Sequence, residues 1–332
     1  MIELLTPENG ASVTLLNRKH VEYIRNPKNG SASKIDWLAL RETQEDLSFP
    51  LPVRFTFSPA VPAVLVLRDP QGRERTVPAE NGSAEVTNLL IDADYTWQIR
   101  TGHETSQTFS FHTDPTPPRL ISVSGISNVR DFGGFRVADG GRVRQGMLYR
   151  TSEMDTHANI TAEGIRTLTD ELGIRTDIDL RGVGGEPRGP VLDPDIVRWY
   201  NFPLAAYADC FSETQLKLFG DSYRLLTDAN IYPAICHCWG GIDRTGTWLY
   251  ILGAMLGVSE DDLGLDYEFS SFSRWGCRSR HSEQFVGFLD GLRKFGSTLQ
   301  ERGKGFMKAA GLNDAELGRI RELLTEETRK YG

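Results

Sequence analysis

The apolar positions in the first third of the chain fall into short runs that alternate with polar positions. Between residues 49 and 113, these runs are bounded by turn-forming sequences such as Asp69-Pro70-Gln71-Gly72 and Asn81-Gly82. Runs of this length, period and spacing predict an antiparallel β-sandwich. The predicted strands span 52–57, 63–67, 84–89, 95–100 and 108–112.

The segments before these strands are less regular. Residues 3–16 can supply a first strand of the sandwich, and 18–26 have a weak helical pattern that ends at Pro27. Residues 28–48 are polar without a clear period, so we expect a loop excursion on the sandwich rather than a separate domain. Nothing in this part carries catalytic chemistry.

The rest of the chain alternates between strand-like apolar runs and helix-like stripes. The runs occupy 174–181, 196–204 and 231–236, and one stripe, Leu216, Phe219, Tyr223 and Leu226, is typical of core packing. This alternation predicts an α/β fold with a central, mostly parallel sheet flanked by helices. The proline-rich sequence at 114–118 separates the two parts. We therefore predict a sandwich domain at 1–114, a linker at 115–123 and an α/β domain at 124–332.

Composition and charge narrow the class of protein. The 332 residues carry a formal net charge of −8, which argues against a nucleic-acid or anionic-membrane binder. The apolar runs are too short for a transmembrane span, and the first residues lack a signal-peptide pattern. The expected location is the cytoplasm, or the cell envelope or exterior if a signal peptide was removed. The cysteines Cys210, Cys236, Cys238 and Cys277 do not form a disulfide framework.

One stretch combines several features of an anion site. After the strand-like run at 231–236 comes His-Cys-Trp-Gly-Gly-Ile-Asp-Arg-Thr-Gly at 237–246, followed by an apolar helix pattern that Gly257 ends. The N-terminus of a helix offers unpaired N–H groups and a positive dipole, which favour a thiolate at Cys238. Gly240 and Gly241 allow the backbone to turn its N–H groups around an oxyanion, and Arg244 can bind two of its oxygens. Thr245 can donate a hydrogen bond to the sulfur.

A metal site built from Cys236, His237 and Cys238 is the poorer interpretation. Consecutive strand side chains point to opposite faces, and no second ligand pair has zinc-like spacing. We therefore expect neither a metal nor a cofactor.

The stretch at 237–246 resembles the extended Cys-x5-Arg signature of the protein tyrosine phosphatase superfamily. Asn-Val-Arg-Asp-Phe-Gly-Gly at 128–134, Asp-Leu-Arg at 179–181 and Asp-Tyr at 266–267 are similar to motifs of the atypical bacterial tyrosine phosphatases. This resemblance covers about residues 124–327. Residues 89–99 and 110–113 resemble the later strands of a fibronectin type III domain in the immunoglobulin-like class, in which Tyr95 would be the corner tyrosine, although core packing is the preferred interpretation of Tyr95 and Trp97. Such a module can bind a partner or a sugar, but a spacer or a wall beside the active site is the expected role.

The phosphatase resemblance implies hydrolysis of phosphomonoesters through a phosphocysteine. Cys238 would attack phosphorus, and Arg244 would stabilise the equatorial oxygens together with the loop N–H groups. His237 would organise the loop. The residues expected to bind substrate are Trp239, Gly240, Gly241, Ile242, Thr245 and Arg181, although Arg181 could equally form a structural salt bridge.

The general acid is a separate question, because the sequence has no Trp-Pro-Asp tripeptide. Asp243 matches an aspartate that atypical members carry within the loop, and it is the first choice. Asp179 and Asp209 are the alternatives. For each of the three carboxylates, a salt-bridged or solvated structural role is the competing interpretation.

The substrate class follows from two departures from the family pattern. Ile242 stands where the common loop has lysine, which should weaken binding of multiply phosphorylated headgroups. Trp239 is bulky and could line the mouth or pack outward. We expect a phosphorylated protein or small phosphomonoester as the partner, with phosphotyrosine favoured over phosphoinositides or dual specificity. A sulfurtransferase and a phosphate-binding pseudophosphatase are the other classes considered.

Overall fold

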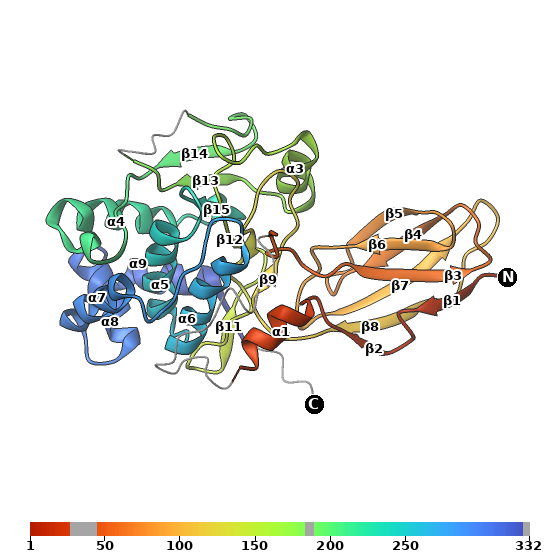
Figure 1. The fold of residues 1–332 in the computed structure, drawn as a ribbon, viewed down its shortest axis with the longest axis horizontal. Coiled ribbons are helices and arrows are strands. Elements are labelled where there is room, and N and C mark those ends of the chain that lie inside the picture. The colour runs from red at the N-terminus through yellow and green to blue at the C-terminus, as the bar shows by residue number, and fades with distance from the viewer. Residues whose placement is uncertain (27–44, 183–188, 328–332) are drawn as a thin grey trace. The chain divides into compact units, whose positions relative to one another are not determined.

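The structure is a computed structural model that describes residues 1–26, 45–182 and 189–327 (Figure 1). It divides into two compact units. The first comprises Met1–His20 and Pro50–Ser122, and the second Val21–Phe49 and Val123–Gly332. The boundary between the units falls within helix α1 (Arg18–Ile24). The presence of this helix confirms the helical pattern predicted for residues 18–26.

The stretch expected to be a loop excursion, 28–48, lies outside the described residues except for its last four. The described residues on either side of the gap belong to the second unit rather than to the sandwich. The Tyr23 hydroxyl donates to Glu268 at 2.6 Å, and the Leu47 N–H donates to the Phe272 carbonyl at 2.8 Å.

The first unit consists of two sheets around one core. One sheet has the order β1 (Glu3–Thr6), β3 (Val53–Ser58), β6 (Ser83–Val86). The other has the order β2 (Ala11–Val13), β8 (Phe109–Thr113), β7 (Asp94–Arg100), β4 (Ala63–Arg68), β5 (Glu74–Ala79). Pairing is antiparallel except between β2 and β8. Strand β9 (Arg119–Leu120) lies near the end of the unit.

The core of this unit explains the alternating pattern of its sequence. Along β3, Val53, Phe55 and Phe57 are buried, while the residues between them are not. The rings of Phe55 and Trp97 from the two sheets meet edge to face at 5.1 Å. Because both sheets direct alternate side chains into this core, the period-2 pattern was readable from sequence.

The central sheet of the second unit has the order β14 (Arg198–Asn201), β13 (Thr176–Asp179), β15 (Ala234–His237), β12 (Leu148–Thr151), β10 (Arg130–Asp131). The first four strands are parallel, and β10 runs antiparallel to β12. Their register aligns Asp179, His237 and Thr151 at the carboxyl edge. This edge is where α/β sheets place their ligand sites.

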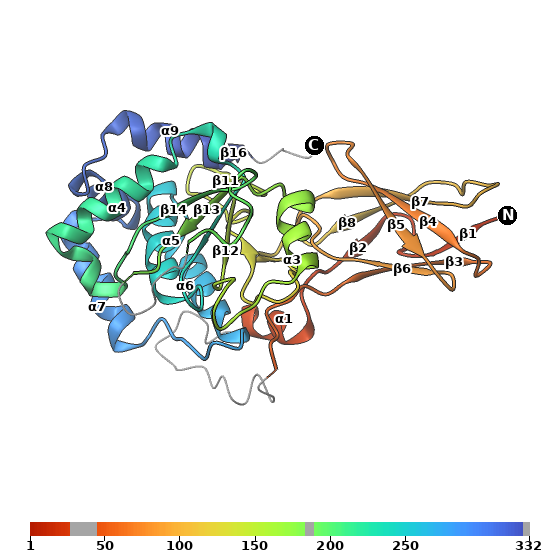
Figure 2. The same cartoon turned by 90° about the horizontal axis from the view of Figure 1, so that it is seen from above.

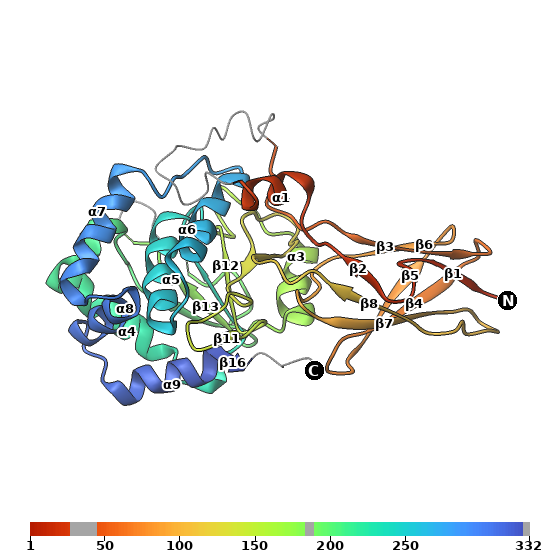
Figure 3. The ribbon, with the colours of Figure 1, turned by 90° about the horizontal axis from the view of Figure 1, so that it is seen from below.

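Helices surround this sheet. They are α3 (Ala162–Arg166), α4 (Glu213–Leu225), α5 (Asp243–Leu256), α6 (Glu260–Phe269), α7 (Glu283–Leu292), α8 (Leu299–Ala309) and α9 (Asp314–Leu324). Helix α8 packs along α5, with α4 and α9 beside it (Figures 2 and 3). Strands β11 (Gly141–Val143) and β16 (Thr325–Glu327) form a small antiparallel pair.

Short helical segments complete the second unit, at Thr167–Glu171, Tyr207–Phe211, Ala229–Ile231, Ser270–Phe272 and Arg293–Phe295. Helix α5 is buried from Thr245 to Leu256 and ends at Gly257, whose φ is 95°. Within the described ranges, we find no helix with the length and apolar character needed to cross a bilayer.

Candidate active site

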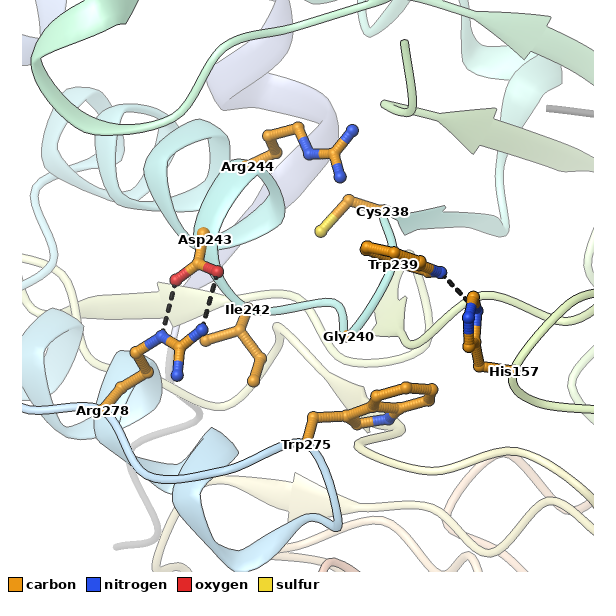
Figure 4. A pocket seen from close by; sticks show the side chains of 9 residues that line it. All are labelled: His157, Cys238, Trp239, Gly240, Ile242, Asp243, Arg244, Trp275 and Arg278. Carbon is orange, nitrogen blue, oxygen red and sulfur yellow. Dashed lines mark hydrogen bonds and ion pairs between the residues drawn. The ribbon is translucent and has the colours of Figure 1, made fainter. Parts of the chain in front are cut away.

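A pocket of about 280 Å³ opens where β15 passes into α5. Its lining residues are His157, Cys238, Trp239, Gly240, Ile242, Asp243, Arg244, Trp275 and Arg278. Figure 4 shows the sulfur of Cys238 directed into the space framed by Arg244, Asp243 and Trp239. The structure thus brings most of the sequence-predicted residues together and adds three from distant segments, His157, Trp275 and Arg278.

The loop carbonyls from residue 238 to residue 241 all accept hydrogen bonds from groups outside the loop. In order, the donors are His237 Nδ1 at 3.2 Å, Glu153 N at 2.8 Å, Asn128 Nδ2 at 2.9 Å and Arg150 Nη2 at 2.5 Å. In a trans peptide, each C=O and the following N–H point in opposite directions. The N–H groups of 239–242 therefore face away from these donors, and no acceptor for them exists among the described residues. This arrangement forms an anion cradle.

The backbone conformation of the loop requires glycine at position 241. Gly241 has a φ of +66°, and a Cβ there would lie 2.0 Å from the Thr151 carbonyl at the end of β12. The glycine is therefore required both by its left-handed conformation and by the close approach of the strand.

A buried ion-pair network of Arg130, Arg150 and Asp266 supports the loop. Asp266 accepts from Arg130 Nε at 2.6 Å and from Arg150 Nη1 at 2.5 Å, and none of the three side chains is more than 4% exposed. Burial raises the pKa of Asp266, but the two guanidinium groups outweigh it and hold the pKa below its usual value. Burial, with the neighbouring Arg150, lowers the pKa of Arg130 to about 10. Since Arg150 also holds the Gly241 carbonyl, this ion-pair network extends to the loop.

His237 is fully buried beside a second carboxylate. Its Nε2 lies 3.1 Å from an oxygen of Asp177. Burial alone would lower the pKa of His237, but Asp177 and then Asp179 outweigh burial and raise it to about 9. A charged imidazole has hydrogens on both nitrogens, which agrees with Nδ1 donating to the Cys238 carbonyl. This geometry fits the predicted organising role.

Arg181 does not line the pocket. It is 1% exposed and pairs with Asp155 at 2.5 Å, Asp179 at 2.9 Å and Glu153 at 3.2 Å. Three carboxylates already neutralise this guanidinium, so the geometry corresponds to a structural salt bridge rather than a phosphate contact. Asp179 is one of these three carboxylates and is paired with Arg181.

Asp243 lines the pocket and is bound on both of its oxygens. Arg278 donates to them through Nε at 2.7 Å and Nη2 at 2.9 Å, and the Tyr207 hydroxyl donates to the first oxygen as well. Burial raises the pKa of Asp243, but hydrogen bonds and charge from Arg278 outweigh burial and keep it below its usual value. Asp209, the remaining alternative, is exposed on the Tyr207–Phe211 helix and is not part of the pocket wall.

The pocket mouth is aromatic. The Trp239 indole is 39% exposed and lines the pocket, which resolves its orientation. Its Nε1 donates to His157 Nδ1 at 2.6 Å, and the two rings meet edge to face at 4.6 Å. A Cβ at Gly240 would lie 3.1 Å from the Cβ of Trp275, so the second indole is packed against the loop.

Ile242 and Thr245 of the loop are both buried. Ile242 is 2% exposed and gives the pocket an apolar wall. The Thr245 hydroxyl is also buried and makes no hydrogen bond within the described residues, so the hydrogen bond to Cys238 expected from sequence is not formed.

The other buried thiols and the pairing of the pocket arginines bear on what the site can bind. Burial raises the pKa of the Cys210 and Cys236 thiols, which disfavours their thiolates. The Arg244 guanidinium makes no hydrogen bond or ion pair with any residue in the described part of the chain. In contrast to Arg278, it is available to an anion in the pocket.

Several residues of the site were missed by sequence reasoning. Asn128 and Asp266 lie in family-like motifs, but their roles in supporting the loop could not be read from those motifs. Trp275 and Arg278 lie in a segment without any period, and the sequence gives no signal for them.

Comparison with known proteins identifies the family. The profile described as "Tyrosine phosphatase family" matches residues 121–326, and the chain therefore belongs to the tyrosine phosphatase family. A curated protein of Cupriavidus necator, provisionally named a tyrosine-protein phosphatase, is 30% identical over 46% of this chain. The match spans 66% of that relative's length, slightly less than two thirds.

Among solved structures, the core catalytic domain of the PP-IP phosphatase SIW14 from S. cerevisiae, in complex with citrate, is similar to part of this chain. The TM-score is 0.31 and the sequence identity 15%, with 42% of this chain and 80% of the yeast chain covered.

Proposed function

We propose that the protein is a cysteine-dependent phosphatase that hydrolyses phosphomonoesters, with phosphotyrosine as the preferred class. The observation that carries the proposal is the orientation of the loop. The N–H groups of 239–242 face away from the four donors that hold the loop carbonyls, and they lie beside the Cys238 thiol and the Arg244 guanidinium, which has no partner among the described residues. Such a set of donors suits the equatorial oxygens of a transferring phosphoryl group.

In the first step, the Cys238 thiolate attacks phosphorus, an S–P bond forms, and the bond between phosphorus and the leaving oxygen breaks. The loop N–H groups and Arg244 stabilise the charge on the equatorial oxygens. The leaving oxygen takes a proton from the carboxyl group of Asp243 and departs as an alcohol or phenol.

In the second step, water attacks the phosphocysteine. Asp243, now ionised, accepts a proton from that water, a new O–P bond forms, and the S–P bond breaks to regenerate the thiolate. Phosphate then leaves the pocket. Each turnover consumes one water and leaves the side chains in their starting states.

The preference for an aryl phosphate rests on the pocket walls. Trp239, Trp275 and Ile242 offer apolar surface on which an aromatic ring can pack. Of the cations in the pocket wall, Arg278 is neutralised by Asp243, which leaves Arg244 for the scissile phosphate. In the free protein, Arg244 is thus the guanidinium of the pocket wall without a carboxylate partner among the described residues, which favours a monophosphorylated substrate over a multiply phosphorylated headgroup.

A substrate panel tests the proposal. Phosphotyrosine peptides, phosphoserine peptides and phosphoinositides are assayed for phosphate release by wild type and by Cys238→Ser, with thiosulfate as a sulfurtransferase substrate. We expect release from phosphotyrosine peptides that Cys238→Ser abolishes. A higher kcat/KM for phosphoinositides than for phosphotyrosine peptides would make phosphoinositides the preferred substrate class. Turnover retained in Cys238→Ser would overturn the mechanism.

A further inference from the structure

The ion pair between Asp243 and Arg278 separates two pockets. Both residues line the pocket that contains Cys238, and both line a neighbouring pocket of about 550 Å³. The other residues of this second pocket are Tyr207, Cys277, Ser279, Ser282 and Gln284. A substrate that extends beyond its phosphate can therefore meet Arg278 from either side.

The pairing conflicts with the role of Asp243 as an acid. A general acid must carry a proton, yet the Asp243 carboxylate already accepts three hydrogen bonds, two from Arg278 and one from Tyr207. These donors favour the ionised form. In the free protein, Asp243 is therefore ionised and cannot protonate a leaving group until one of its hydrogen-bond donors is displaced.

Arg278 is the donor to Asp243 that is best placed to be displaced. Its backbone is fixed by the buried Ser271, whose hydroxyl accepts from the Arg278 N–H at 2.8 Å and donates to the Arg278 carbonyl at 3.0 Å. Its side chain is 33% exposed. Because the backbone is held and the guanidinium is accessible, Arg278 can change partners without moving its loop.

The surrounding segment is basic in a chain that is acidic overall. Residues 273–281 contain three arginines and one histidine and no acidic residue, while the whole chain carries −8. Arg280 is committed to Glu268 at 2.9 Å in the interior. Arg274 is exposed over the Trp275 ring at 4.8 Å. Of these arginines, Arg278 is the one that lines the pocket and can meet an anionic group placed close to the scissile phosphate.

We propose that Arg278 binds a carboxylate of the phosphopeptide next to the phosphotyrosine, and that this exchange of partners releases Asp243 to act on the leaving oxygen. The inference rests on the proposed function and adds a substrate feature to it, an acidic residue flanking the phosphotyrosine. Arg278 keeps one carboxylate partner throughout, so the exchange loses no ion pair.

Each proton that Asp243 takes up during a turnover is released again. With Arg278 withdrawn and a phosphoryl dianion nearby, the Asp243 carboxylate takes one proton from solvent, because like charges disfavour its ionised form. That proton passes to the phenolate oxygen as its bond to phosphorus breaks. Asp243 later receives a proton from the attacking water and returns it to solvent when Arg278 pairs with it again.

The test compares two phosphotyrosine peptides that differ only in flanking residues, glutamate in one and alanine in the other. We expect wild type to prefer the acidic peptide in kcat/KM by about tenfold, and Arg278→Gln to lose this preference. Arg293→Gln is the matched control, since Arg293 is 67% exposed and pairs with Asp290 outside both pockets.

A pH profile separates this role from a structural one. For the alanine peptide, loss of protonated Asp243 sets the basic limb of kcat/KM, and Arg278→Gln should move that limb to higher pH because the cation that holds Asp243 ionised is gone. An acidic preference that persists in Arg278→Gln, or is absent in wild type, overturns the inference while leaving the proposed function intact. A doubly phosphorylated inositol preferred over both peptides also overturns it. If wild type releases phosphate from no phosphomonoester, both proposals fail.

Discussion

The Nε2 atom of His237 lies 3.1 Å from a carboxylate oxygen of Asp177, and neither side chain is more than 2% exposed. The two residues lie on the adjacent parallel strands β15 and β13, and His237 directly precedes Cys238 in the chain. A charged imidazole at this point connects the sheet to the loop, because its other nitrogen bonds the Cys238 carbonyl. We therefore expect the charge state of His237 to affect both the stability of the fold and the activity of the site.

Stability should fall with rising pH in the alkaline range. The pKa of His237 is raised from 6.5 to about 9 in the folded protein. A group with a raised folded pKa stabilises fully below its unfolded pKa and loses that contribution as pH rises through its folded pKa. We expect wild type to lose on the order of 3 kcal/mol between about pH 6.5 and 9 from this group. Chemical denaturation of the second unit across this range measures the loss.

Asp177→Asn provides the comparison for this prediction. The variant is expected to be less stable at pH 6.5 and to show a flatter dependence up to pH 9, because its histidine is no longer held charged. Parallel pH curves for the two proteins would show that His237 does not titrate in this range.

Asp243→Asn should divide substrates by their leaving groups. An amide cannot donate the proton that a poor leaving oxygen needs, so kcat for phosphotyrosine peptides should drop by roughly 10²-fold or more. Hydrolysis of an activated aryl phosphate, whose leaving group departs without protonation, should be nearly unchanged. Steady-state kinetics on both substrates decide the point, and an equal loss on both would assign Asp243 a purely structural role.

Gly241→Ala should abolish the cradle. The added Cβ would meet the Thr151 carbonyl at 2.0 Å and would force a left-handed conformation on alanine. We expect a destabilisation of about 1–3 kcal/mol or more, with kcat/KM reduced at least 10²-fold. Gly287→Ala on α7 is the control, since a Cβ there has nothing within 4 Å, and it should be neutral or slightly stabilising. Thermal melts and kinetics on both variants test the contrast.

Asn128→Asp should weaken anion binding with little change in shape. The substitution replaces the Nδ2 donor to the Gly240 carbonyl with an acceptor, so that the peptide between residues 240 and 241 loses its anchor. Aspartate also tolerates the backbone φ of 61° found at this position. We expect inhibition by inorganic phosphate or vanadate to weaken by about tenfold, because the Nδ2 group that donates to the Gly240 carbonyl at 2.9 Å and to the Gly241 carbonyl at 3.3 Å is lost. A binding constant equal to that of wild type would show that the loop keeps its orientation without Asn128.

The strand, loop and helix that form the cradle could be predicted because their signals are local. The apolar run at 231–236, the glycines and the stop at Gly257 all act within a few residues of the elements they define. Strand β5 was missed because Pro78 and its charged residues mask the pattern. Pro78 is tolerated there since β5 is the edge strand of its sheet.

The rest of the site depends on burial and on contacts distant in sequence. Arg181 could be a phosphate ligand or an ion-pair partner until the structure showed three carboxylates around it. Arg278 is 35 residues from Asp243 along the chain, and the segment around it has no period from which its position could be inferred. The absence of lysine at position 242 predicted weaker binding of multiply phosphorylated headgroups, but it gave no sign that Arg278 would enter the pocket wall from another loop.

The contact between Gly240 and Trp275 links the evolution of the catalytic loop to that of the pocket wall. A Cβ at position 240 would lie 3.1 and 3.2 Å from the Cβ and Cγ of Trp275, so Trp275 would have to shift by a few tenths of an ångström to admit it. Replacement of either residue therefore constrains the other, and the two positions should change together among descendants of this sequence. A relative with a larger residue at 240 would be expected to carry a smaller one at 275, and with it a wider entrance and a broader range of phosphate esters.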